Sequence, residues 1–229
     1  MGRSLRAAEG GLVYHALNRA NARLVIFAED GDYEAFEAIL AEAVQRYEMR
    51  LLSYCLMPTH FHLVLWPVAD GDLSRFMRWL TLTHTQRWHA FHRTTGSGHL
   101  YQGRFKSFPI QSDEHLWTVC RYVERNPLCA ELVPRAEKWR WGSLWQQGRS
   151  KPRTPMPPLS PWPIARPADW VKRVNAKVAP AEEEPLRRAI DRNQPFGAPE
   201  WQASIAKRLG LESTMRPIGR PRKDPKSST

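Results

Sequence analysis

The sequence predicts an α+β protein built around a ferredoxin-like antiparallel sheet with helices on one face. Three observations lead to this prediction. Short runs of alternating apolar residues, typical of strands, are separated by longer stretches with apolar residues at helical spacing. Their order through residue 147 is β-α-β-β-α-β followed by one more helix, which is the ferredoxin-like order. A proline-rich stretch then interrupts the pattern, so a linker and a small helical C-terminal extension are expected.

The first half of the sheet is predicted from three strand-like runs. Residues 11–17 alternate well enough for a strand, and Asp32–Glu48 then carries apolar residues at helical spacing, with Asp30 or Asp32 as the expected cap. Arg50–Leu56 is the second strand. The next three residues break it, and His60–Trp66 is the third. The second and third strands are therefore expected to form a hairpin.

The second half contains two helices and one strand. Residues 72–92 repeat apolar side chains at helical spacing, and a glycine-containing loop over 94–98 leads to a fourth strand over Tyr101–Ile110. A third helix begins at Asp113. Because proline lacks a backbone N–H and clashes with the preceding turn, we expect this helix to stop near Pro127.

The chain is expected to divide into a first domain over 1–147, a linker over 148–167 and an extension over 168–229. Seven of the 19 prolines lie in the linker range. In the extension, helices are predicted over Glu182–Arg192 and Pro199–Leu209, which allows a helix-turn-helix-like pair. The tail beyond them is basic. It suits either an arm in an A·T-rich minor groove, contacting DNA through Arg220 and Arg222, or a solvated segment.

Composition predicts a polyanionic partner for this protein, and it predicts a cytoplasmic location. The net charge is +11 and the pI is near 10.0, which favours nucleic acid as a partner over a merely basic surface. No basic amphipathic helix beside an anchor and no apolar run of membrane-spanning length suggests a membrane. The three cysteines, Cys55, Cys120 and Cys129, form no C-x-x-C pair and are expected to be reduced and mostly buried.

His60-Phe61-His62 is the first candidate site. Because successive strand side chains alternate faces, both imidazoles project to one side and Phe61 to the other. This spacing can present two imidazoles to one metal ion. In an arbitrary protein, however, such a pair is more often two unrelated polar residues.

Tyr122 and Asn126 form a second candidate pair. They lie four residues apart at one edge of the apolar stripe of the helix that begins at Asp113. A tyrosine at such an edge usually packs its ring and exposes its hydroxyl. His89 and His92 can also share a helical face, but packing or solvation explains them better than a second metal site.

Three segments together resemble one family. They are Leu56–His62, Tyr101–Ser107 and Arg121–Pro127, and in this order they are similar to the REP-associated tyrosine transposases of bacteria, members of the single-tyrosine HUH family. The resemblance runs from about Val13 to Trp145, so it covers most of the first domain, which it identifies as catalytic.

The resemblance implies a metal-dependent enzyme that nicks and rejoins single-stranded DNA at palindromic hairpins. His60 and His62 match the two histidine ligands of an Mg²⁺ or Mn²⁺ ion, Tyr122 matches the nucleophile, and Asn126 matches a third polar ligand. Attack by the tyrosine would give a 5′-phosphotyrosine and a free 3′-hydroxyl. The bond energy is conserved, so rejoining needs no nucleotide triphosphate, and the chain has no phosphate-binding G-x-x-x-x-G-K-[ST] motif. The general base is not identified by the sequence.

DNA contacts are expected beside this site. Cys129 stands where the family commonly has a basic residue and Glu131 where it commonly has glycine, which puts nearby contacts in doubt. Other polar or basic residues beside strands are expected to contact the DNA backbone, with solvated surface as the alternative: Asn18, Arg19, Arg104 and Lys106.

Two alternatives stay open from the sequence. The first is a DNA-binding protein of palindromic repeats that no longer cuts, although such a protein has no chemical need for the two histidines, the tyrosine and the asparagine. The second is an RNA-recognition module, which Gln102–Phe108 resembles faintly but without the second aromatic-flanked glycine pattern. The C-terminal extension resembles the larger REP-associated type rather than the compact insertion-sequence enzymes. That resemblance implies a monomer in which Tyr122 serves its own histidines; a dimer exchanging tyrosine helices is the alternative.

Overall fold

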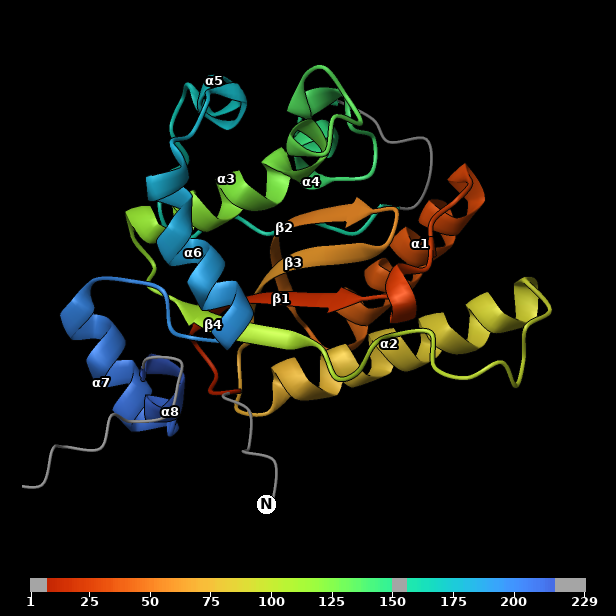
Figure 1. The fold of residues 1–229 in the computed structure, drawn as a ribbon, viewed down its shortest axis with the longest axis horizontal. Coiled ribbons are helices and arrows are strands. Elements are labelled where there is room, and N and C mark those ends of the chain that lie inside the picture. Colours follow the sequence, from red (N-terminus) through yellow and green to blue (C-terminus); the bar gives the residue numbers. More distant parts are fainter. Residues whose placement is uncertain (1–7, 150–155, 217–229) are drawn as a thin grey trace, which may run out of the picture.

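The centre of the protein is a four-stranded antiparallel sheet. The computed structural model describes residues 8–149 and 156–216. The strand order is β2-β3-β1-β4 with every neighbouring pair antiparallel, which confirms the ferredoxin-like arrangement (Figure 1). The strands are β1 (Val13–Arg19), β2 (Arg50–Met57), β3 (His60–Trp66) and β4 (Lys106–Ile110).

Two helices, α1 (Asp30–Arg46) and α2 (Asp72–Phe91), cover one face of this sheet. The short 3₁₀ helix η1 (Asn21–Arg23) precedes α1. The carboxylate of Asp32 accepts hydrogen bonds from the backbone N–H groups of Ala28 and Glu29, at 2.9 and 3.2 Å, and so fixes the start of α1. Between the helices and the sheet lies a core rich in aromatic and aliphatic side chains, including Tyr14, Phe36, Phe61, Leu63 and Phe76.

The opposite face is also covered. The expectation of helices on one face holds for α1 and α2 only, because α3 (Glu114–Cys129) packs on the other side, over β2 and β3 (Figure 1). The reason lies in the strands, which are buried along nearly their whole length and therefore apolar on both faces. A second core forms there, and α3 contributes Leu116, Val119, Cys120 and Val123 to it.

The predicted bounds 11–17 and Asp32–Glu48 are each displaced by two residues from β1 and α1. Two further differences have a local cause. The helix over α3 continues past Pro127 to Cys129, so the proline lies in its last turn and the chain leaves the helix at Ala130. Glu131 then has a φ of 56°, a backbone conformation that glycine adopts most easily. The fourth strand begins at Lys106 rather than Tyr101. Tyr101 forms an isolated antiparallel bridge to Ala20, and Lys106 pairs with Leu17, so the regular pairing is interrupted over residues 102–105.

The C-terminal part of the chain packs onto the α3 face. Trp170, Val174, Leu186 and Phe196 belong to the same buried cluster as the apolar stripe of α3. The predicted helices over 182–192 and 199–209 are confirmed as α6 and α7. The remaining elements are η2 (Ala136–Lys138), α4 (Ser143–Gln147), α5 (Trp170–Asn175), α6 (Pro180–Arg192), α7 (Pro199–Leu209) and α8 (Glu212–Met215).

Both outer strands are hydrogen-bonded by segments from this part of the chain. Along β2, the backbone N–H of Ser160 donates to the carbonyl of Leu51 at 2.8 Å, and Nε1 of Trp162 donates to that of Leu52 at 2.9 Å. Along β4, the N–H of Phe196 donates to the carbonyl of Pro109 at 2.9 Å. The described part of the proline-rich segment therefore lies against the domain, and the proposed domain boundaries stay a prediction.

All three cysteines are free thiols. Cys55 and Cys120 are buried free thiols, and Cys129 is an exposed one. Among the described residues, no helix combines the length and the apolar character needed to span a bilayer.

Candidate active site

The pairing register of β3 brings its two histidines to the face covered by α3. His60 lies opposite Arg19 of β1 and Met57 of β2, and His62 lies opposite Leu17 and Cys55. The two imidazole rings have centroids 5.0 Å apart. Phe61 between them points into the core beneath α1 and α2. The alternation predicted from the sequence is therefore confirmed.

Helix α3 adds Tyr122 to the same place. Its apolar stripe is pressed against the sheet, which leaves Tyr122 at the edge of the second core, partly buried. The tyrosine ring stands edge-on to the ring of His62, with centroids 5.7 Å apart and planes at 84°. Residues separated by 60 positions thus meet within a single chain.

Burial keeps both imidazoles neutral. Desolvation, and then the positive charge of Arg19, lower the pKa of His60 from 6.5 to about 4. Desolvation also lowers the pKa of His62 well below its ordinary value, with His60, His15 and Arg19 acting in the same direction. Neutral imidazole is the form that binds a cation.

The nitrogen atoms of these rings have distinct surroundings. Nδ1 of His60 lies 3.1 Å from Oγ1 of Thr59, and Nδ1 of His62 lies 2.9 Å from Nε2 of His15. Nε2 of His62 is buried and has no hydrogen-bond partner among the described residues. A buried imidazole nitrogen in this state is an atom that could bind a cation when it carries a lone pair.

Asn126 uses its amide nitrogen within α3. Nδ2 donates a hydrogen bond of 2.8 Å to the backbone carbonyl of Tyr122, one turn earlier in the helix. None of the described residues donates a hydrogen bond to Oδ1, so this is the atom that a ligand could use. Two imidazoles and an amide oxygen suit a divalent cation of intermediate softness. The role of Asn126 as third ligand stays a prediction.

The tyrosine hydroxyl carries its proton at neutral pH. Burial raises the pKa of Tyr122 above 10.0, and the largest opposing influence is the positive charge of Arg187. Arg187 belongs to α6, where it pairs with Glu183 at 2.8 Å. The extension therefore places a charged pair beside the tyrosine. This pair could not be predicted, because nothing in the sequence shows which helix of the extension faces the sheet.

Four predicted DNA-contacting residues line one cavity. It has a volume of about 270 Å³ and lies between the end of β1, residues 102–106 and the end of α6. Nζ of Lys106 is 4.0 Å from the carboxylate of Asp191 on α6. Asn18 is buried, and its amide lies 3.5 Å from the carbonyl of Gly103. The lining includes Asn18, Arg19, Arg104 and Lys106. Arg220 and Arg222 lie outside the described residues.

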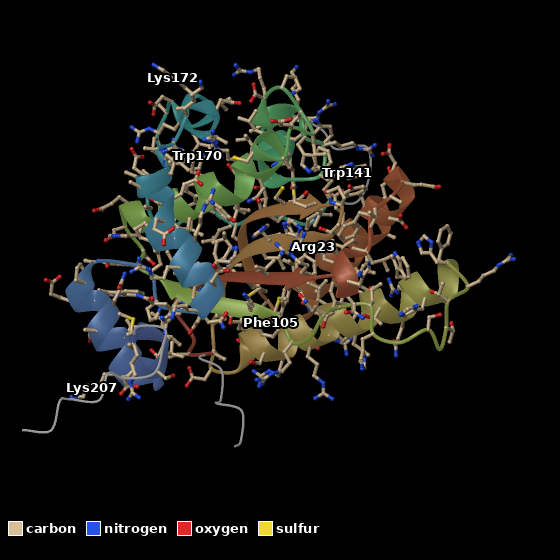
Figure 2. The ribbon with its side chains drawn as sticks, viewed as in Figure 1. Arg23, Phe105, Trp141, Trp170, Lys172 and Lys207 are labelled. Atoms are coloured by element: carbon tan, nitrogen blue, oxygen red, sulfur yellow. The ribbon has the colours of Figure 1, made fainter. Side chains whose placement is uncertain are left out.

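Glu124 fixes α3 in this position, and sequence reasoning missed it. Its Oε1 accepts hydrogen bonds from the hydroxyls of Ser53 and Ser143, at 3.1 and 2.6 Å, and its Oε2 accepts one from Nε1 of Trp170 at 2.7 Å. Figure 2 shows Trp170 between α5 and α3. The carboxylate thus joins the tyrosine helix to β2, α4 and α5. A glutamate two positions after a tyrosine carries no signal of this role, since its partners are remote in the sequence.

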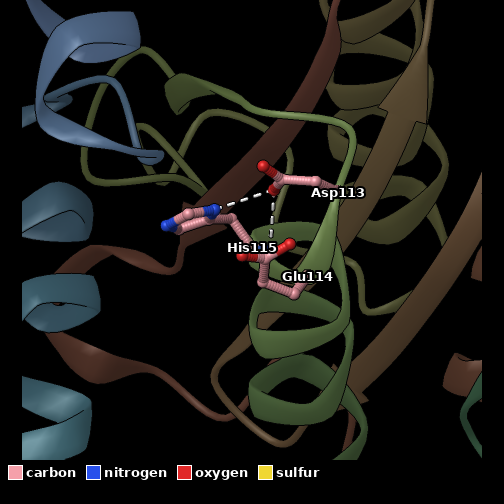
Figure 3. A group of neighbouring side chains, drawn as sticks. All are labelled: Asp113, Glu114 and His115. Carbon is pink, nitrogen blue, oxygen red and sulfur yellow. Dashed lines mark hydrogen bonds and ion pairs between the residues drawn. The ribbon is translucent and has the colours of Figure 1, made fainter.

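A second group of possible ligands lies at the other end of α3. The ligand atoms of Asp113, Glu114 and His115 lie within 4.8 Å of one another (Figure 3). Oδ1 of Asp113 accepts from the backbone N–H of His115 at 2.9 Å and from its Nδ1 at 2.7 Å. These contacts are those of a helix N-cap. At 1.5 Å per residue, Asp113 lies about 13 Å along the helix from Tyr122, so this group is separate from the predicted site.

The comparisons place the chain in a family. The family described as "Transposase IS200 like" matches residues 9–126, more than half of the chain. The chain belongs to this family. Among curated proteins, none matches it.

Two solved structures are similar to this fold. The structure of a REP-associated tyrosine transposase bound to a REP hairpin is 16% identical, with a TM-score of 0.54 over 73% of this chain and 93% of that one. A protein from Deinococcus radiodurans R1 assigned as a transposase is 19% identical, with a TM-score of 0.40 over 54% of this chain and 96% of that one. At these identities the first likeness supports the fold.

Proposed function

We propose that this protein is a metal-dependent endonuclease and transesterase that nicks and rejoins single-stranded DNA at palindromic hairpin repeats. One observation carries the proposal. His60 and His62 from β3 and Tyr122 from α3 meet at one place in a single chain, the imidazoles are neutral, and Nε2 of His62 has no hydrogen-bond partner among the described residues. A structural metal site needs no tyrosine and a packed tyrosine needs no neutral imidazoles, whereas phosphodiester transfer through a covalent intermediate uses both.

His60, His62 and Asn126 would hold the cation, Mg²⁺ or Mn²⁺. When bound, it polarises the scissile phosphate and offsets the charge that develops there. All three ligands are neutral, so the positive charge of the site remains available for the anionic phosphate. Imidazole ligands favour Mn²⁺ over the harder Mg²⁺.

Tyr122 is the nucleophile of the proposed reaction. Its Oη forms a bond to the phosphorus as the bond from phosphorus to the 3′ oxygen breaks, which gives a 5′-phosphotyrosine and a free 3′-hydroxyl. The phenol proton must leave during the attack, because burial raises the pKa of Tyr122 and the hydroxyl is protonated beforehand. The reverse attack by a 3′-hydroxyl rejoins the strand without a nucleotide triphosphate.

The DNA is expected to reach the site along the basic cavity at the end of β1. Arg19, Arg104 and Lys106 line it, and Arg19 lies directly opposite His60 in the sheet. Backbone phosphates are the natural ligands of such a group. The similar REP-associated transposase was solved with a REP hairpin, which supports hairpin DNA as the substrate.

We propose that the protein acts as a monomer in the cytoplasm. Tyr122 lies beside the histidines of its own chain, so the site needs no residue from a second copy. Light scattering of the purified protein tests this, and a stable dimer would contradict it.

Cleavage of a hairpin oligonucleotide in Mn²⁺ tests the proposed reaction. The native protein should release a fragment with a free 3′-hydroxyl and retain the other as a covalent adduct that migrates slowly in a denaturing gel. Tyr122→Phe should give neither product. Tyr47→Phe, a change of a half-buried tyrosine on the far face of the sheet, should cleave as the native protein does.

Changing both His60 and His62 to alanine should abolish cleavage while hairpin binding is largely retained, because the phosphate contacts come from other side chains. Normal hairpin binding by the native protein with no adduct in any divalent ion would instead identify a DNA-binding protein that does not cut.

A further inference from the structure

His15 is a buried histidine that the proposed reaction does not use. It lies in the middle of β1 with 1% of its surface exposed, two residues before Leu17, which pairs with His62. Its Nε2 lies 2.9 Å from Nδ1 of His62, and its ring packs on Phe108 with centroids 5.0 Å apart. A histidine inside a sheet, hydrogen-bonded to another histidine, needs a physical explanation.

The hydrogen bond between the two rings contains one proton, and its position decides what His62 can bind. If His15 donates from Nε2, neutral His62 must carry its own proton on Nε2, where it is buried without an acceptor among the described residues. If His62 donates from Nδ1, its Nε2 instead has a lone pair pointing into the site. A buried N–H without an acceptor is unfavourable, and only the second arrangement lets a cation bind there.

His60 shows the same arrangement with a different partner. Its Nδ1 lies 3.1 Å from the hydroxyl of Thr59, which can accept a proton from it. In both histidines, Nδ1 therefore lies within hydrogen-bond distance of a side chain that takes no part in the proposed reaction. In both, Nε2 is the nitrogen left for the site.

We propose that His15 is a positioning residue that holds the proton of His62 on Nδ1 and so presents Nε2 of His62 to the divalent cation. The inference rests on the proposed function, because it assumes that His62 is a metal ligand. His15 accepts the hydrogen bond through its own Nε2 and carries its proton on Nδ1. It touches neither cation nor DNA, and it acts through the ring of His62 alone.

The first test is the tautomer of His62 in the native protein without metal. Long-range ¹H–¹⁵N correlation spectra of protein labelled at histidine distinguish a protonated Nδ1 from a protonated Nε2, and loss of signals in His62→Ala assigns the ring. We expect His62 to be protonated on Nδ1 alone. A proton on Nε2 overturns the proposal, whatever the enzyme does with DNA.

The second test is Mn²⁺ affinity, measured by calorimetry without DNA. His15→Phe keeps the ring against Phe108 but removes the acceptor, and we expect the dissociation constant to rise about 10–100-fold. His15→Gln keeps an acceptor and should lose less. His84→Phe is the matched control, since His84 is equally buried and hydrogen-bonded, to Tyr101 at 2.6 Å, but lies on α2 beneath the other face. It should bind Mn²⁺ as the native protein does.

The outcomes separate the inference from the proposed function. If native protein binds Mn²⁺, loses it in His60→Ala, and keeps it in a folded His15→Phe, the role of His15 is wrong while the metal site stands. If native protein does not bind Mn²⁺ at these histidines, both fail. Urea unfolding of each variant in the absence of metal shows whether it is folded.

Discussion

Replacing Glu124 tests whether the tyrosine helix is held by a buried carboxylate. The side chain is 3% exposed and accepts three hydrogen bonds, from Ser53, Ser143 and Trp170. Glu124→Leu removes both acceptor oxygens, and with them all three hydrogen bonds, and keeps a side chain of similar size. Glu124→Gln keeps one oxygen and replaces the other by an amide nitrogen.

The structure sets the size of each effect. The two serine hydroxyls have other acceptors, since their oxygens are 2.9 Å apart and Oγ of Ser143 is 3.2 Å from the carbonyl of Tyr54. In the described part of the chain, Nε1 of Trp170 has no acceptor other than Glu124. An orphaned buried donor costs about 1–3 kcal/mol. The serine hydroxyls keep other partners, and the leucine variant also removes the desolvated carboxyl whose pKa burial raises, so we expect Glu124→Leu to lower the unfolding free energy by about 1–3 kcal/mol. Glutamine can accept from Trp170 and donate to the serine oxygens, which reduces the expected loss to about 1 kcal/mol.

Urea unfolding followed by far-ultraviolet circular dichroism measures these losses. Glu114→Gln, an exposed glutamate on the same helix, serves as the control and should change stability by no more than about 0.5 kcal/mol. The reasoning is refuted if Glu124→Leu is as stable as the native protein. It is also refuted if the glutamine variant loses as much as the leucine variant, because the oxygen facing Trp170 would then have no effect.

Three further predictions follow from buried, charged and crowded positions. Burial raises the pKa of Glu37 from 4.5 to about 7, so the folded protein favours the protonated carboxyl. As pH rises from 4.5 through 7, the native protein should lose about 3 kcal/mol of stability relative to Glu37→Gln. Urea unfolding at each pH measures this, and a pH-independent difference between the two proteins would contradict it. Lys106→Gln should weaken hairpin binding and reduce the slope of log affinity against log salt by about 0.7–0.9 in anisotropy titrations, whereas an unchanged slope would show that Lys106 contacts no phosphate. Gly197→Ala should lower the melting temperature, since a Cβ there would lie 2.6 Å from the ring of Trp201 and 2.8 Å from Cβ of Gln111; unaltered melting would mean that this contact relaxes freely.

The fold could be predicted wherever one element carries its own signal. His60–Trp66 is a strand with the predicted bounds, because apolar alternation and the preceding break at Pro58 both mark it. Pro199–Leu209 is a helix with the predicted bounds, because proline at its start and Gly210 after its end mark both limits. The fourth strand starts five residues late, since whether residues 101–105 pair regularly depends on their register against the end of β1.

The site could be predicted only as far as local spacing reached. The alternation of His60 and His62 is a property of one strand, and the likeness of the segments around them to a known family added Tyr122 and Asn126. His15 depends on the register between β1 and β3, which no single segment contains. Alternation along the strand places His15 on the same face as Leu17, but the sequence does not show which residue of β3 lies beside it. Glu183 and Arg187 were missed for the same reason, because their place beside Tyr122 depends on how the extension folds back.

The covering of both outer strands has a consequence for how copies of this protein meet. An open strand presents unpaired N–H and carbonyl groups, which invite another chain to extend the sheet and lead to association or aggregation. Here the open side of β2 is occupied by hydrogen bonds from Ser160 and Trp162 and by the bridge between Cys55 and Gly142, and β4 is paired with Phe196. The C-terminal half therefore prevents the edge strands of one molecule from pairing with those of another. Removing it would expose both edge strands, so a shortened chain should tend to aggregate.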